Sequence, residues 1–249
     1  MRKLLISVLF ILVYSTSWGQ FTVDKLRLRI GYNLHNTNAK RFNHLIDQFN
    51  NQRYPQEISD NLGGLNWMFG MVGGADYVFS EGIILHAVLK SRRQFIETPY
   101  ANIAMFRSYL FRQHTLELSA SMILLEEKWF NHSVGAGFTF GVLGVFTNWA
   151  EQSGYPGARN MVNIDHTASV GLSLNYEAQL KLHDNLRLFI RPVAQFALES
   201  HVRRLSDFFE PQIIQGNVTY GEGLDEKYDN GTLNGLGIEG GLLILLPQF

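Results

Sequence analysis

The sequence contains no cysteine. The chain therefore has no disulfide framework and no thiolate metal site, and it cannot be a lipoprotein acylated on a first mature Cys. Long apolar runs are also missing: beyond residue 19, none reaches the ~18 residues that a transmembrane helix needs. An exported chain without such a helix is either a soluble periplasmic protein or a closed barrel, because in lipid only helices and closed barrels satisfy every backbone N–H and C=O.

The first residues do indicate export. Arg2 and Lys3 precede a short apolar stretch, Leu4 to Tyr14, and small residues flank the predicted cleavage point before Gln20. The pattern predicts a signal peptide over 1–19; the alternative, an N-terminal membrane anchor, would need a longer apolar stretch. Without the leader the chain carries 19 Lys and Arg against 22 Asp and Glu, a net charge of about −3. This balance argues against nucleic acid as a partner, because phosphate binding favours a basic face.

Strict alternation of apolar and polar residues is the strongest signal in the mature chain. Over 167–182 the apolar residues all fall on one face, along a length greater than the usual strand of about 5–6 residues. A strand of a membrane barrel needs roughly 9–11 residues, alternating between lipid and lumen. Similar alternation occurs over 25–34, 66–79, 83–92, 116–124, 134–142, 186–199 and about 233–249. The sequence therefore predicts eight strands, an even number as single-chain barrels require.

The connections between these strands alternate in length. Residues 80–82, 125–132 and 183–185 form short turns, whereas 36–64, 97–108, 147–166 and 200–232 form long polar connections. This alternation is typical of a barrel whose turns face the periplasm and whose loops face outward. Within the first loop, helical spacing of apolar residues over 39–53 predicts a short amphipathic helix.

The leader, the eight strands, the alternating connections and the terminal Phe249 together resemble the small outer-membrane β-barrel superfamily, similar to the barrel domain of OmpA-type proteins. The resemblance implies an all-β fold: an eight-stranded antiparallel up-and-down transmembrane β-barrel over 20–249, with long extracellular loops, in the bacterial outer membrane. It also implies that the barrel-assembly machinery reads Phe249 as an assembly signal. However, Phe249 is out of phase with the more apolar face of its strand, which predicts a bulge or break at Pro247.

Ten charged residues fall on the lumen side of the predicted strands. The interior of an eight-stranded barrel is just wide enough for side chains, and buried charges must be paired. We therefore expect an interior ion-pair network that fills the lumen; a narrow ion path and a substrate site are the alternatives. The predicted members are Arg27, Arg29, Asp76, Lys90, Arg92, Glu117, Glu177, Arg187, Arg191 and Glu239.

Motifs for catalysis or cofactor binding are weak. Residues 235–240 match the GxGxxG spacing, but they lie within a predicted strand, so the dinucleotide-binding interpretation fails and no cofactor is expected. The histidines show no metal spacing, and those at 132, 166, 183 and 201 are expected in turns or loops. A lipid A-modifying enzyme would need a Ser–His pair facing the membrane; the nearest pair, His166 and Ser169, has opposite parity. No catalytic or metal-binding residue is predicted.

The leading hypothesis is thus a non-enzymatic outer-membrane barrel with a structural or binding role through its extracellular loops. Its expected partners are outer-membrane lipid, the barrel-assembly machinery, and an envelope or secretion-complex protein. The alternatives are a lipid A-modifying enzyme, a porin-like narrow pore or transport component, and a soluble periplasmic lipid-binding barrel.

Overall fold

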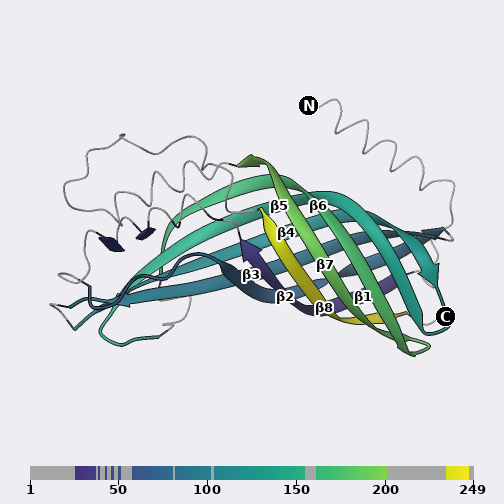
Figure 1. Cartoon of the computed structure of the whole chain (residues 1–249), viewed down its shortest axis with the longest axis horizontal. Helices are drawn as coiled ribbons and strands as arrows, with labels where there is room; N and C mark the ends of the chain where they lie inside the picture. Colours follow the sequence, from purple (N-terminus) through teal and green to yellow (C-terminus); the bar gives the residue numbers. More distant parts are fainter. Residues whose placement is uncertain are drawn as a thin grey trace.

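Eight antiparallel strands in chain order form a closed barrel in the computed structural model (Figure 1). Each strand pairs with its sequence neighbours, and β1 closes the ring against β8. The predicted fold class and the number of strands are therefore confirmed. The strands are β1 (Leu26–Thr37), β2 (Trp67–Ser80), β3 (Ile83–Pro99), β4 (Phe106–Glu126), β5 (Phe130–Ala150), β6 (Val162–His183), β7 (Leu186–Ser200) and β8 (Gly235–Leu245).

The structure describes residues 26–37, 39, 43, 46–47, 50–51, 58–80, 82–101, 104–154, 161–200 and 234–246. The predicted signal peptide, Pro247, Phe249 and most of the fourth long connection lie outside these ranges. Among the described residues, no helix is long and apolar enough to cross a membrane.

The eight strands differ greatly in length. β4, β5 and β6 have 21, 21 and 22 residues, whereas β1 and β8 have 12 and 11. Two expected loops are consequently shorter than predicted: the connection expected at 97–108 spans 100–105, and that expected at 147–166 spans 151–161. The extra residues continue β3 to β6 beyond the rest of the ring, at the end of the barrel that carries the longer connections (Figure 1).

Side chains alternate between the two faces of the ring as the sequence predicts. Large apolar residues on the outside are exposed, as in Leu28, Ile30, Tyr32 and Leu34 of β1, while Arg29 and Asn33 between them are buried. The outward face of β8 consists of Leu236, Ile238, Leu242 and Ile244. Leu243 on the opposite face is buried, so Phe249 shares the parity of inward-facing residues.

The GxGxxG match lies within β8, as expected. In this strand glycine permits close backbone approach at the seam: a Cβ on Gly241 would overlap the carbonyl oxygen of Ile30 on β1. On the neighbouring strand, a Cβ on Gly31 would overlap the carbonyl oxygen of Gly240. These glycines let the first and last strands meet.

Within the predicted helix over 39–53, the described residues Asn43, Ile46, Asp47, Asn50 and Asn51 are helical. The N–H of Asn43 donates to the carbonyl of Ala39 at 2.9 Å, and Ile46 is buried.

Candidate functional site: the interior of the barrel

The interior contains a closed ring of four alternating charges, which we call the charge quartet: Lys90, Glu117, Arg191 and Glu239. Lys90 Nζ donates to Glu117 at 2.6 Å, and Arg191 Nη1 donates to Glu239 at 3.0 Å. Glu117 also pairs with Arg191, and Lys90 with Glu239. The four side chains come from β3, β4, β7 and β8, and all are essentially inaccessible to solvent. The quartet thus ties opposite walls of the barrel together.

A second chain of charges extends from the quartet. Arg191 Nε lies 3.7 Å from Glu177, and Glu177 pairs with Arg29 at 2.7 Å. Arg29 in turn binds both oxygens of Asp76, at 2.7 and 3.3 Å, and its guanidinium lies 4.3 Å from the ring centroid of Phe189. Because a buried charge is costly unless it is paired, this continuous network explains how so many ionised groups occupy one interior.

The remaining three predicted residues are not in ion pairs with any carboxylate that the structure describes. Arg92 is fully buried and donates to Gln195 at 2.8 Å and Gln113 at 3.4 Å. Arg187 donates to Gln179 at 3.2 Å, near the end with the short turns. Arg27 also lies near this end of the interior, two residues before Arg29 on β1.

The fully buried charges balance. Four cations (Arg29, Lys90, Arg92, Arg191) face four acids (Asp76, Glu117, Glu177, Glu239), and their formal charges cancel. Arg92 therefore balances the charge of the fourth acid from a distance, and its own hydrogen bonds go to glutamine side chains and not to a carboxylate. The most deeply buried part of the interior is therefore a neutral polar core, and the less buried Arg27 and Arg187 add positive charge towards the end with the short turns.

The sequence did not reveal a linear arrangement of Asp76, His86 and Ser121. His86 Nδ1 lies 2.8 Å from Asp76 Oδ1, and His86 Nε2 lies 2.9 Å from Ser121 Oγ. This is the order of groups in a Ser–His–Asp triad. However, His86 and Ser121 are each only 3% exposed, Asp76 is committed to Arg29, and Ser121 also lies 3.3 Å from Asn175 Oδ1. The arrangement is a buried hydrogen-bond chain without room for a substrate.

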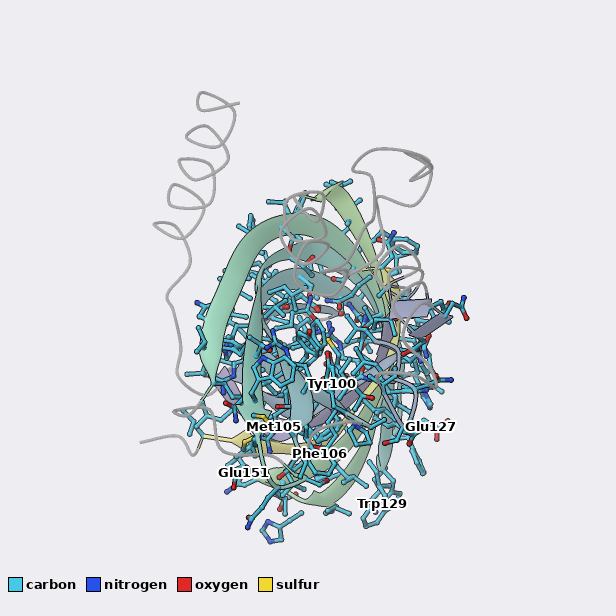
Figure 2. The ribbon with its side chains drawn as sticks, turned by 90° about the vertical axis from the view of Figure 1, so that its left-hand side faces the viewer. Tyr100, Met105, Phe106, Glu127, Trp129 and Glu151 are labelled. Carbon is cyan, nitrogen blue, oxygen red and sulfur yellow. The ribbon has the colours of Figure 1, made fainter. Side chains whose placement is uncertain are left out.

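Above the charges, towards the longer connections, the interior becomes apolar. The inward residues of the extended strands form a cluster with the first connection, and we call this cluster the apolar cap. Figure 2 looks into the barrel from that end, where Tyr100 and Met105 are labelled, and shows side chains across the interior. The cap consists of Ala39, Ile46, Ile58, Leu62, Leu65, Met68, Ile96, Tyr109, Phe111, Leu143 and Val145.

Hydrogen bonds hold the first connection over this cap. The side chain of Asn50 both donates to the carbonyl of Leu62 (3.0 Å) and accepts from its N–H (2.8 Å). Asn43 makes the same pair of bonds with Leu65, at 3.1 and 2.7 Å. Two asparagines of the helical segment thus bind backbone groups of a connection that packs inward and does not pair with a strand there.

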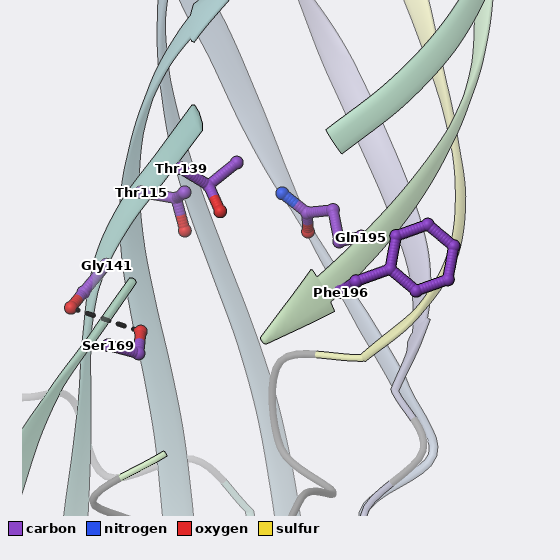
Figure 3. A pocket seen from close by; sticks show the side chains of 6 residues that line it. All are labelled: Thr115, Thr139, Gly141, Ser169, Gln195 and Phe196. Carbon is purple, nitrogen blue, oxygen red and sulfur yellow. Dashed lines mark hydrogen bonds between the residues drawn. The ribbon is translucent and has the colours of Figure 1, made fainter. Parts of the chain in front are cut away.

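A small cavity lies between the cap and the charges, lined by Thr115, Thr139, Gly141, Ser169, Gln195 and Phe196 (Figure 3). Ser169 donates to the carbonyl of Gly141 at 3.3 Å, and Gln195 accepts from Arg92. The lining is neutral, and three of its six residues carry hydroxyl groups.

Three expectations about histidines are wrong. His132 lies in β5, where its Nδ1 is 2.5 Å from the Tyr176 hydroxyl, His166 lies in β6, and His183 is the last residue of β6. His201 lies outside the described residues. Within the described part of the chain, no group of His, Asp and Glu is arranged to hold a metal ion.

The closed eight-stranded antiparallel ring, with its polar interior and apolar exterior, is the up-and-down β-barrel that the sequence predicts. Among solved structures, the chain is similar to the attachment invasion locus protein Ail of Yersinia pestis in complex with sucrose octasulfate (TM-score 0.43, 9% identity, 88% of this chain and 97% of that one). It is also similar to Neisserial surface protein A (0.42, 9%, 89% and 97%) and to CarO2 of Acinetobacter baumannii (0.33, 10%, 87% and 98%). No family model and no curated protein matches the sequence.

Proposed function

We propose that the protein is a non-enzymatic outer-membrane barrel whose lumen is closed and whose loop end binds a partner. The observation that carries this proposal is the combination of an apolar exterior with an interior crossed by the charge quartet. The exterior supports the membrane location: outward residues such as Leu89, Phe138 and Leu174 are 63%, 55% and 54% exposed. Large apolar side chains exposed on every strand would be unfavourable in water and suit a lipid surface.

Two layers support a closed lumen. The charge quartet spans the interior from β3 and β4 to β7 and β8, and the apolar cap fills the region above it. An ion crossing the barrel would have to separate paired charges and then enter a region lined by Leu65, Phe111 and Leu143. Both steps are costly, which argues against the alternative of a narrow pore.

The binding surface would be the loop end. The tall wall of β3 to β6 projects there. On its inner side Arg107 lies 4.6 Å from the ring centroid of Trp149, which packs against Tyr100 in a tilted arrangement with ring centroids 4.9 Å apart. Trp149 is 42% exposed. Exposed aromatic residues next to Arg are enriched at protein interfaces, so an envelope protein or a subunit of a secretion complex is the proposed partner. The fourth long connection, 200–232, is also proposed to contribute to this surface, because binding residues concentrate on loops held by a rigid scaffold.

The lipid A-modifying alternative receives no support from the described residues. Ser121 and His86 face the interior and are buried, whereas lipid reaches only the outside of the barrel. Mass spectrometry of lipid A from cells with and without the protein tests this directly. An altered spectrum that depends on Ser121 would contradict the non-enzymatic proposal.

Recording of the purified protein in planar bilayers tests the closed lumen. We expect no steady conductance from the wild type, and larger or more frequent openings from Glu117→Ala/Arg191→Ala, which removes half of the quartet. Lys181→Ala is the matched control, because its ion pair with Asp184 lies on the surface. Steady, large conductance of the wild type would refute closure. Fractionation and heat-modifiable migration test the location, and recovery in the soluble periplasm would refute it.

A further inference from the structure

Two arginines lie directly opposite each other on the outside of the barrel. Arg93 on β3 pairs in register with Arg112 on β4. Their chain neighbours Arg92 and Gln113 are buried in the interior, so alternation places Arg93 and Arg112 on the exterior. His114, the next outward residue of β4, is exposed and contributes a third nitrogen-bearing side chain.

The arginines lie directly above an apolar belt. On β3 the outward residues below Arg93 include Ile83, Leu85 and Leu89, and all three are exposed. The ten residues from Ile83 to Arg93 span about 34 Å of strand, which at a tilt of 35–45° gives a rise of about 24–28 Å. The apolar band of outer-membrane barrels is about 25 Å tall. Arg93 therefore lies at the upper boundary of the band.

Aromatic residues mark the same height. Phe69 of β2 pairs with Arg93 and is 53% exposed, and Trp67 is 51% exposed. Aromatic girdles lie at the two interfaces of such barrels. The girdle and the strand geometry thus agree independently on where the outer membrane surface crosses β2 to β4.

Like charges directly opposite on neighbouring strands destabilise a sheet. The Arg112 guanidinium lies 5.4 Å from the Phe146 ring centroid, a contact that holds it against the barrel wall. An anion between Arg93 and Arg112 would turn their repulsion into attraction, and the planar donor fork of Arg matches the geometry of phosphate oxygens.

We infer that Arg93, Arg112 and His114 bind the phosphorylated headgroup of a glycolipid in the outer leaflet, with its acyl chains along the belt below. The inference rests on the proposed membrane location. The belt favours a lipid over a soluble phosphate, because it offers a surface for acyl chains. Met71, which pairs with Ser91, and Leu89 lie below the arginines on the outside of the barrel and are 55% and 63% exposed.

The test uses the full refolded protein in detergent, with bound lipid counted by native mass spectrometry. The probes are bisphosphorylated lipid A and the same lipid A after removal of both phosphates. We expect the Arg93→Gln/Arg112→Gln variant and the dephosphorylated lipid each to lower binding at least about tenfold. Arg93→Lys/Arg112→Lys should retain part of the binding, since charge remains without the planar fork. Lys128→Gln, in a turn at the opposite end, is the matched control.

Equal binding of lipid A with and without phosphates would overturn the inference, as would equal loss in Lys128→Gln. Full competition by inorganic pyrophosphate would also overturn it, because the site would then be for a soluble anion. Heat-modifiable migration shows whether each variant is folded, and single Arg→Gln variants replace a double variant that does not fold. Recovery of the protein outside the outer membrane would refute the proposed function separately, because the binding measurement uses purified protein.

Discussion

Neutralising Glu117 is the most direct test of the charge quartet. In Glu117→Gln the side-chain volume is kept, but the partner of both Lys90 and Arg191 loses its charge. The four most deeply buried cations then face three acids. Removing one partner of a buried ion pair costs about 3–5 kcal/mol, and the hydrogen bond from Ser119 to Glu117, at 3.0 Å, weakens as well. We expect the free energy of unfolding to fall by about 3–5 kcal/mol.

Denaturant titration in lipid vesicles, followed by tryptophan fluorescence, measures this change. Lys181→Gln is the control, because it breaks a surface pair with Asp184 and should leave stability unchanged. A second comparison replaces charges in pairs: Lys90→Met/Glu117→Leu keeps the interior neutral and should be more stable than Glu117→Gln alone. If Glu117→Gln matches the wild type within about 1 kcal/mol, the network does not stabilise the barrel and the reasoning fails.

Three further predictions follow from the strands, the cap and the C-terminus. Gly70→Ala should abolish folding into the heat-modifiable form, since its Cβ would overlap the carbonyl oxygen of Ser91, whereas Gly73→Ala on the same strand should fold normally because its nearest neighbour lies 4.0 Å away. Phe111→Ala should lower the free energy of unfolding by about 3–5 kcal/mol by creating a cavity in the apolar cap; an unchanged denaturation midpoint would show that the cap is not packed. Deleting Phe249 should slow assembly in cells, measured by pulse-chase, without changing the stability of the refolded protein, and normal assembly would refute its role as a signal.

Much of the barrel could be predicted because its two faces differ so strongly in polarity. Strict alternation specified the eight strands, and it specified which side chains, such as Arg29 and Glu177, face inward. The partners within the network could not be predicted, because they depend on the register between strands. The contact of Arg191 with Glu117 joins β7 to β4 across the interior, and no sequence spacing encodes it.

The length of the strands was harder to predict. In the upper part of β3 to β5 the inward residues are apolar, including Ile96, Tyr109 and Val145, and Leu110, which has the outward parity, is also apolar and buried. The alternation therefore disappears where the strand continues, and a period-2 pattern ends too early. The first connection covers this inner face, and its packing explains why the residues there are apolar. Phe189, an apolar residue of the lower interior, also escaped prediction, because it packs there against the Arg29 guanidinium and not against other apolar residues of a recognisable face.

The unequal strand lengths also make the ring mechanically uneven. β4 and β5 run beside each other for almost their whole lengths, while β1 and β8 share the short, glycine-rich seam. Each residue of ladder adds backbone hydrogen bonds, so an outward force on the wall would separate the short ladders on either side of β8 before the long ladder between β4 and β5. The ladder between β1 and β8 joins the two ends of the sheet, so the barrel closes there. The line of closure and the weak part of the wall therefore meet at the last strand.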